Sequence, residues 1–287
     1  MRILFTADIH LGYERSEPGS RNFLENLSRI KNLDAIVIAG DVAENGPEST
    51  DEIGKHHRTV FELLKKTGCP NIAFCAGSHD IWCLGGIPDS WEIFQNALFE
   101  MAKEFGFIYL EHENLYLGET AIVGTMAHYD YSMAEEGLVS DGITVRTKHY
   151  RIKIPPGYDA PVWGDALYIK WQHDDISACN VILEDFEKRL SEANEKSKTI
   201  LVASHTVPIP DVNGHIFNTN LKKRFLNAFC GTNHLNEILL RQNKSGKIKE
   251  AVSGHTHIKI GPIIKNQIKY RNIGGDYGSP RYEIIEV

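Results

Sequence analysis

The chain alternates short apolar runs with segments of helical periodicity, and this alternation constrains the fold more than any other feature. The clearest run, Ala-Ile-Val-Ile-Ala at 35–39, predicts a strand buried on both faces. Similar strands are predicted at 3–7, 71–75, 199–203 and 248–252, and shorter ones at 107–110, 115–117, 120–124, 262–265, 268–270 and 282–285. Helices are predicted at 20–31, 51–67, 90–105, 176–193, 221–229 and 234–241. The alternation favours an α/β fold with a mostly parallel sheet.

Each of the five longer strands is followed by polar residues that can bind a metal or transfer a proton. These residues are Asp8 and His10, Asp41, the group Ser78, His79 and Asp80, then His205, and finally His255 and His257. The carboxyl ends of parallel strands meet at one edge of a sheet, so we expect these side chains to lie together. Mixed imidazole and carboxylate ligands suit Mn, Fe, Zn or Co better than Ca or Mg. The pattern therefore predicts a metal centre.

The strand-end residues belong to short blocks whose order and composition resemble a known family. The blocks Asp8-Ile9-His10, Gly40-Asp41, Gly77-Ser78-His79-Asp80, His205 and Gly254-His255-Thr256-His257 are similar to the signature of the calcineurin-like metallophosphoesterases. They run from residue 8 to residue 257 and so cover nearly the whole chain. The resemblance implies a single domain over 1–287, folded as a four-layer α/β/β/α sandwich of two mixed sheets with a dinuclear metal site at the strand ends.

The resemblance also implies a role for each site residue. Asp8, His10 and His257 are expected to bind one metal, His205 and His255 the second, and Asp41 both. The two ions, Mn with Fe, Zn, Co or Ni as alternatives, would lie about 3.5–4 Å apart and share a hydroxide that attacks phosphorus. His79 would be the general acid for the leaving oxygen, and Asp80 would orient the His79 ring. The implied activity is hydrolysis of a phosphomonoester or phosphodiester, with nucleotide-like compounds among the candidate substrates.

Ser78 departs from the family pattern. The family normally has Asn at this position, and the amide oxygen of that Asn ligates the second metal. A serine hydroxyl lies closer to the backbone than an amide oxygen, and metal–oxygen distances tolerate only a few tenths of an ångström of error. Ser78 would bind the second metal directly, through a water, or not at all. We therefore expect the second site to be the weaker one.

Residues 127–175 show neither helical nor strand periodicity, and the segment is too long for a simple connection. We expect a functional loop, a cap or lid, or a small subdomain. The segment is rich in aromatic residues that either stack on a substrate or form its own small core: Tyr129, Tyr131, Tyr150, Tyr158, Trp163, Tyr168 and Trp171. Further pocket walls are expected from 128–130 and 206–220. His128 and His215 are candidates to approach the site, but a structural or solvent-exposed position is favoured for each, and the turn at 274–278 is another candidate neighbour.

The charge distribution bears on the alternatives. The net charge is −7, with −13 in residues 1–143 and +6 in residues 144–287. This acidic balance argues against nucleic acid as a partner, but the basic stretches at 146–153 and 222–224 keep a DNA or RNA nuclease as an alternative. A second alternative, supported only by Ser78, is a catalytically weak module that binds phosphorylated ligands.

Other features of the sequence concern its surroundings. No apolar run approaches the roughly 20 residues that span a bilayer, and the first residues predict a strand rather than a signal peptide. We expect a cytoplasmic protein without membrane contact. The five cysteines show no Cys-x-x-Cys spacing, so reduced thiols are expected. The sequence leaves the oligomeric state open.

Overall fold

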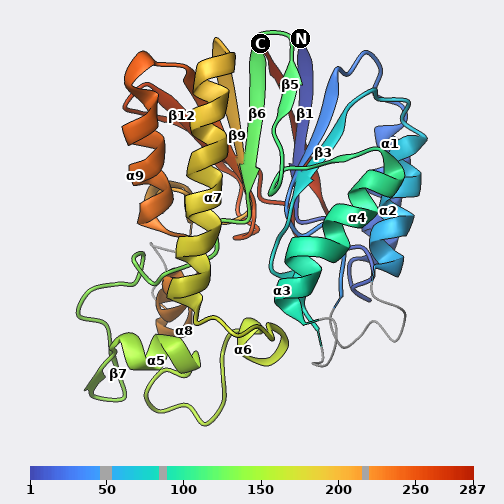
Figure 1. The fold of residues 1–287 in the computed structure, drawn as a ribbon. Helices are drawn as coiled ribbons and strands as arrows, with labels where there is room; N and C mark the ends of the chain where they lie inside the picture. The colour runs from blue at the N-terminus through green and yellow to red at the C-terminus, as the bar shows by residue number, and fades with distance from the viewer. Residues whose placement is uncertain (46–53, 84–88, 215–219) are drawn as a thin grey trace.

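Two mixed β-sheets face each other at the centre of the molecule (Figure 1). The computed structural model describes residues 1–45, 54–83, 89–214 and 220–287. The first sheet has the strand order β13 (Arg281–Glu286), β1 (Arg2–Ala7), β2 (Ala35–Ala39), β3 (Ile72–Cys75) and β4 (Ile108–Tyr109). Strands β1 to β4 are parallel, whereas β13 runs antiparallel to β1 with Arg2 opposite Glu286.

The second sheet has the order β11 (Ile260–Lys265), β12 (Ile268–Asn272), β10 (Ile248–Ser253), β9 (Thr199–Ser204), β6 (Thr120–Thr125) and β5 (Leu115–Leu117). Its four inner strands are parallel. The two edge strands, β11 and β5, pair antiparallel with their neighbours. Both sheets are therefore mixed, as the family resemblance implied.

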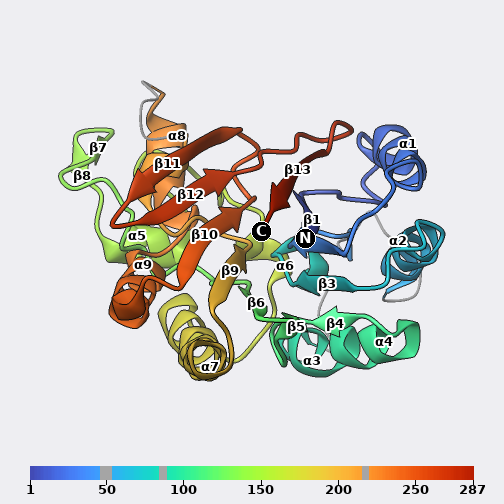
Figure 2. The same cartoon turned by 90° about the horizontal axis from the view of Figure 1, so that it is seen from above.

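Helices cover the outer face of each sheet (Figure 2). On the first sheet lie α1 (Glu17–Leu27), α2 (Lys55–Lys65), α3 (Ser90–Glu92) and α4 (Leu98–Phe105), the last two joined by a π-helical turn at Ile93–Ala97. On the second lie α7 (Asp175–Lys196) and α9 (Asn233–Gln242). The resulting order of helix, sheet, sheet and helix confirms the predicted four-layer sandwich.

Strand β2 shows how the sequence builds these layers. All five of its residues are buried. Ile36 and Ile38 belong to the core beneath the helices, whereas Ala35, Val37 and Ala39 belong to the core between the two sheets. This division follows from the period of two, which points successive side chains to opposite faces of a strand. The predicted apolar run is therefore a strand covered on both sides.

Most predicted elements occur within a few residues of their expected bounds. The helix expected at 20–31 is α1, which begins earlier because Pro18 fits the first turn. The helix expected at 51–67 is described from Lys55 onward, and residues 51–53 lie outside the described residues. All five cysteines are free thiols. Among the helices in the described ranges, none is both long and apolar enough to cross a membrane.

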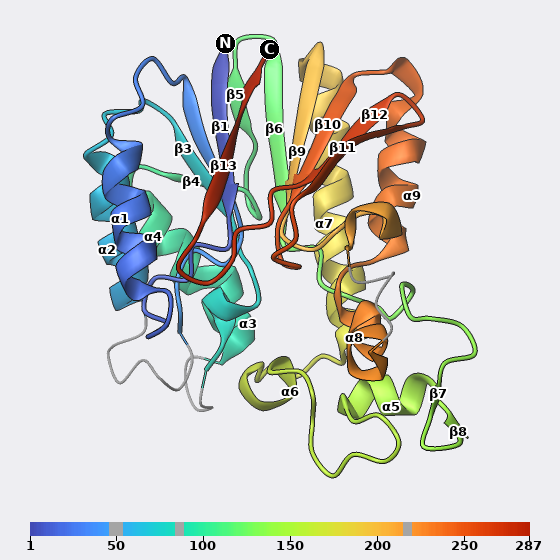
Figure 3. The same cartoon turned by 180° about the vertical axis from the view of Figure 1, so that it is seen from behind.

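Residues 127–175 lie beyond the carboxyl ends of the strands, beside α8 (Leu221–Leu226) (Figure 3). They contain the hairpin β7 (Val139–Ser140) and β8 (Ile143–Thr144), and the short helices α5 (Thr147–Ile152) and α6 (Asp165–Tyr168). Tyr129, Tyr131 and Tyr150 are buried together with Phe225 and Phe229. The aromatic residues were expected either to stack on a substrate or to form a small core, and these three tyrosines form a small core. A role of the segment as cap or lid stays a prediction.

Candidate metal centre

The loops after four strands meet at the carboxyl-terminal edge of the two sheets. From the first sheet, Asp8 and His10 follow β1 and Asp41 follows β2; from the second, His205 follows β9, and His255 and His257 follow β10. All are buried except His257, which is partly buried. The structure thus brings together six residues that are spread from position 8 to position 257 of the sequence, as the strand-end pattern predicted.

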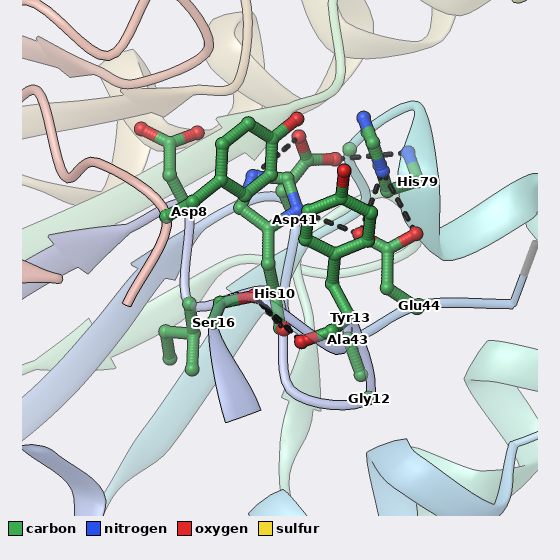
Figure 4. Close-up of polar contacts among 12 residues, drawn as sticks. Asp8, His10, Gly12, Tyr13, Ser16, Asp41, Ala43, Glu44 and His79 are labelled. Atoms are coloured by element: carbon green, nitrogen blue, oxygen red, sulfur yellow. Dashed lines mark hydrogen bonds and ion pairs between the residues drawn. The ribbon is translucent and has the colours of Figure 1, made fainter. Parts of the chain in front are cut away.

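These six side chains form two groups, and the carboxylate of Asp41 in the second group lies close to a histidine of the first. Candidate ligand atoms of Asp8, His10 and His257 lie within 4.8 Å of one another, and so do those of Asp41, His205 and His255. The Asp41 Oδ2 atom lies 3.5 Å from His10 Nε2 and 3.4 Å from His205 Nε2. Asp41 therefore lies between the two groups, where a bridging ligand would have to be. Figure 4 shows Asp8, His10 and Asp41 in this arrangement.

Hydrogen bonds to backbone carbonyls orient two of the imidazole rings. His205 Nδ1 donates to the carbonyl of Ala39 at 3.2 Å, and His255 Nε2 donates to the carbonyl of Phe229 at 2.9 Å. A carbonyl only accepts, so in the neutral rings the other nitrogens carry lone pairs. Those two atoms, His205 Nε2 and His255 Nδ1, are 3.0 Å apart. Facing lone pairs repel unless a cation lies beside them, and a metal ion fits this requirement.

Burial keeps these histidines in the form that binds metals. It lowers the pKa of His205 to about 4, and together with the neighbouring imidazoles it lowers the pKa of His255 to about 3 and of His257 to about 2. Burial, followed by the charge of Asp41, raises the pKa of Asp8, and Asp8 Oδ2 is buried without a hydrogen-bond partner. A buried carboxylate oxygen is expected to have a partner. Neutral imidazoles beside carboxylates form a donor set that fits divalent cations.

The backbone at these residues adopts a conformation that side chains seldom allow. The φ angles are 54° at Asp8, 48° at His10, 49° at Asp41, 71° at His255 and 57° at His257. Each costs about 1–3 kcal/mol and persists where the surroundings enforce it, which is common at functional sites. Close packing also explains why the third block has a glycine at position 77. A Cβ on Gly77 would lie 2.2 Å from Asp41 Oδ1.

Comparison with known proteins agrees with this geometry. A family model described as calcineurin-like phosphoesterase matches residues 1–259. The chain belongs to this family. It is therefore a hydrolase of a family that uses a dimetal centre, and the resemblance drawn from the sequence blocks is confirmed. No curated protein sequence matches the chain.

Two solved structures have a similar fold. Phosphopantetheinyl hydrolase (PptH) from Mycobacterium tuberculosis matches with a TM-score of 0.68 and 19% identity, covering 98% of this chain and 95% of that one. A dimetal phosphatase from Danio rerio matches with a TM-score of 0.57 and 14% identity, covering 99% of this chain and 91% of that one. At these identities the likeness concerns the fold.

In this phosphoesterase, His79 has a different partner from the one predicted. His79 Nδ1 lies 2.7 and 2.9 Å from the two carboxylate oxygens of Glu44, and His10 Nδ1 lies 2.9 Å from the same carboxylate (Figure 4). Burial disfavours the charged ring, but the carboxylates of Glu44 and Asp41 outweigh it and raise the pKa of His79 to about 9. Glu44 thus orients both a candidate metal ligand and the candidate acid.

The role predicted for Asp80 was wrong. Its carboxylate accepts from the backbone N–H groups of Gly77 and Ala43 at 2.7 and 3.0 Å and contacts His57 Nε2 at 2.8 Å. Asp80 is buried in the short 3-10 helix at His79–Ile81, where Gly77, Ala43 and His57 occupy its carboxylate oxygens. Asp80 joins the loops after β2 and β3. Glu44 had a sequence signal, its position three residues after Asp41, but this was not recognised.

A cavity of about 260 Å³ adjoins the candidate metal ligands of the phosphoesterase. Asp41, Ser78, His79, His255 and His257 line it, together with Thr256, Trp163, Leu226, Cys230 and Tyr277. Ser78 therefore lies at the site, but whether its hydroxyl ligates the second metal stays a prediction. The expected contribution of the 127–175 segment comes from Trp163.

Other expected neighbours of the site have mixed outcomes. The turn at 274–278 does reach it, because the Tyr277 ring packs against His10 and His257 with ring centroids 4.7 and 4.6 Å apart. His128 is buried and bonded to Asp175 at 3.0 Å, so its role is structural. His215 lies outside the described residues. In the basic stretches, Lys153 pairs with Asp175 at 2.6 Å and Arg224 pairs with Glu135, so these two cations are partly neutralised.

Proposed function

We propose that this protein is a metal-dependent phosphoesterase that hydrolyses a compact phosphomonoester or phosphodiester, with nucleotides among the candidate substrates. The observation that carries this proposal is the pair of residue groups around Asp41, in which unprotonated imidazole nitrogens face one another beside a buried carboxylate. Asp8, His10 and His257 would bind one ion, and His205 and His255 the other, with Asp41 common to both. We propose Mn as the native metal, with Fe, Zn, Co and Ni as alternatives.

The chain's own residues would divide the work around these ions. When bound, the two cations supply positive charge that polarises the phosphoryl group and favours ionisation of a water. His79 lies at the rim of the cavity and is held in its protonated form by Glu44, so it can donate a proton to the leaving oxygen. The Trp82 ring stacks on His79 with ring centroids 3.6 Å apart and keeps bulk water from that face.

The test is hydrolysis of a substrate panel by protein whose bound metal has been measured. Bis-p-nitrophenyl phosphate, p-nitrophenyl phosphate, nucleotides and a phosphopantetheinylated protein would each be tried with Mn, Fe, Zn, Co, Ni and Mg. We expect turnover with at least one transition metal and a loss of about 100-fold or more in kcat for His79→Ala. Trp91→Ala, a change in a partly buried residue outside the cavity, is the control and should retain the activity.

The alternatives predict other outcomes of the same panel. A nuclease would degrade DNA or RNA with strong salt dependence and would leave the small esters intact. A binding module would hydrolyse nothing although metal analysis shows two bound ions. Turnover of small esters with metal dependence is the outcome that the proposal requires.

A further inference from the structure

The cavity beside the candidate metal-binding residues has a lining of two chemical kinds. Asp41, His255 and His257 line it, and so does an apolar side formed by Trp163, Leu226 and Cys230, whose Trp163 ring packs against His255 with ring centroids 5.6 Å apart. At about 260 Å³ the cavity lies below the usual range of about 300–1,000 Å³ for ligand pockets, so it suits a compact group. A phosphoester bound there would place its phosphate at the metals and its alcohol against the apolar side.

Apart from the histidines beside the candidate metal site, the cavity offers no basic side chain to a second phosphate. Within the described ranges, no Lys or Arg lines it. The three segments outside those ranges, 46–53, 84–88 and 215–219, contain no Lys or Arg in the sequence. An additional phosphate would therefore face Trp163 and Leu226 without a counter-charge, and an unpaired charge in an apolar site is strongly disfavoured.

The apolar side is held firmly by hydrogen bonds. Trp163 Nε1 donates to Asp165 Oδ2 at 2.8 Å, and its ring is nearly parallel to that of Phe229, with an interplanar angle of 13°. Asp165 is buried and also accepts from Trp82 Nε1 at 2.7 Å and from the Tyr129 hydroxyl at 2.9 Å. Because these bonds satisfy Asp165 from three directions, the indole is in place before a ligand arrives. A rigid aromatic wall of this kind lowers the cost of binding a flat or branched apolar group.

We infer that the substrate is a single-phosphate ester of a compact apolar or aromatic alcohol, and that Trp163 selects its leaving group. The inference rests on the proposed function, because it assumes that the cavity holds a phosphoester. In the hydrolysis, a water oxygen forms a bond to phosphorus and loses a proton, the ester P–O bond breaks, and the leaving alkoxide takes a proton from His79. The proton lost by the water returns to His79 through solvent. The apolar group stays against Trp163 throughout.

The first experiment compares 2-phenylethyl phosphate with ethyl phosphate on the manganese-loaded enzyme. Both esters release a primary alkoxide, so their intrinsic reactivities are matched and a difference reports the pocket. We expect kcat/KM to be about tenfold or more higher for 2-phenylethyl phosphate. Trp163→Ala should remove most of this preference, so that the ratio of kcat/KM between the two esters falls toward one. Trp91→Ala, whose side chain does not line the cavity, should preserve it.

Two further measurements extend the test. The first measures binding alone, by calorimetry with two phosphonates that are not hydrolysed. 2-Phenylethylphosphonic acid should bind the loaded protein at least about tenfold more tightly than methylphosphonic acid. In Trp163→Ala the two affinities should become equal. The second compares 2-phenylethyl phosphate with 2-phenylethyl diphosphate, which should be the poorer substrate by about tenfold or more. If Trp163→Ala does not fold, Trp163→Phe replaces it. The kcat/KM ratios between substrates of the unmodified enzyme then still test the inference.

The outcomes separate this inference from the proposed function. Equal kcat/KM for the two monophosphates, or a preference for the diphosphate, overturns the inference while leaving the phosphoesterase activity established. If no ester is hydrolysed by protein with both metals bound, the proposed function fails. The phosphonates then still test the pocket, because tighter binding of the phenylethyl compound supports the inference and equal binding overturns it.

Discussion

His79 is the residue whose surroundings say most about the chemistry. Glu44 contacts its Nδ1 atom, Trp82 stacks on one face, and its backbone N–H donates to Asp41 Oδ1 at 2.9 Å. The ring is therefore constrained in position, in orientation and in charge. Since Glu44 also contacts His10, one carboxylate couples the candidate acid to a candidate metal ligand.

Glu44→Gln should therefore lower kcat more than it raises KM. The amide keeps the size of the side chain but removes the negative charge that favours protonated His79. We expect kcat to fall about 10–100-fold, the usual cost of losing the partner of a working ligand. Asp80→Asn is the comparison. Its main effect should be a lower melting temperature, with a smaller loss of kcat than in Glu44→Gln, since Asp80 joins two loops rather than orienting His79. Steady-state kinetics and calorimetry on both variants would check this, and a larger loss of kcat in Asp80→Asn would contradict the assignment.

Ser78 governs a separate prediction about metal affinity. Titration of metal-free protein with manganese should show one tight and one weaker site, because a serine hydroxyl replaces the amide expected of the family. Ser78→Asn should tighten the weaker site by about tenfold or more. Asp41→Asn should weaken both sites, since its carboxylate lies between the two groups. Equal and tight loading of both sites in the unmodified protein would contradict this account.

At the level of elements, the 127–175 segment is joined to α7 by a buried charge network. Asp175, at the start of α7, contacts His128 Nε2 at 3.0 Å and Lys153 Nζ at 2.6 Å and accepts a hydrogen bond from Tyr131. Burial opposes ionisation of Asp175, but His128 and Lys153 outweigh it and lower the pKa of its carboxyl below the ordinary 3.8. The network stabilises the docked segment while Asp175 is charged.

This network predicts acid sensitivity of the segment. The pKa of Asp175 is lower in the folded state, so its contribution is fully present above pH 3.8 and is lost as the pH falls below that value. Tryptophan fluorescence of the metal-free protein, to which Trp163 and Trp171 contribute, should therefore show loosening in acid. Asp175→Asn should be less stable at neutral pH and should show a shallower acid transition. An unchanged acid profile in Asp175→Asn would contradict the prediction.

The same elements show how far the sequence could be interpreted. The strand-end residues were predictable because each directly follows an apolar run, and the carboxyl ends of parallel strands must meet. The partner of His79 was not predicted. Neither the position of Glu44, three residues after Asp41, nor the 3-10 turn that contains Asp80 leaves a periodic pattern. Trp163 was recognisable only as one of several aromatic residues. Its place in the cavity depends on hydrogen bonds to Asp165 across a segment without periodicity.

On the scale of the whole molecule, the candidate metal ligands come from both sheets. Asp8, His10 and Asp41 follow strands of the first sheet, whereas His205, His255 and His257 follow strands of the second. Without metal, the Nε2 atoms of His10 and His257 face each other between the two sheets at 3.2 Å, and nitrogens of His205 and His255 face each other within the second sheet at 3.0 Å. Bound cations would replace repulsion between lone pairs with attraction to a common charge.

Removing the metals should therefore destabilise the entire fold. Ligand binding to the native state adds about 4 kcal/mol when the free ligand is at 1,000 times its dissociation constant. We expect a chelator to lower the melting temperature by several degrees and added manganese to restore it, as followed by scanning calorimetry. Asp41→Asn should have a smaller response to the chelator. Identical melting with and without metal, in protein shown to bind it, would contradict a connecting role.

The order of the ligands along the chain also has a consequence for biosynthesis. Asp8 and His10 leave the ribosome early, but the residues that complete their group and the neighbouring one, His255 and His257, come almost 250 residues later. A nascent chain would therefore hold only part of the candidate ligand set until β10 has joined the second sheet. Occupancy of both candidate sites would mark a chain in which the two sheets have come together.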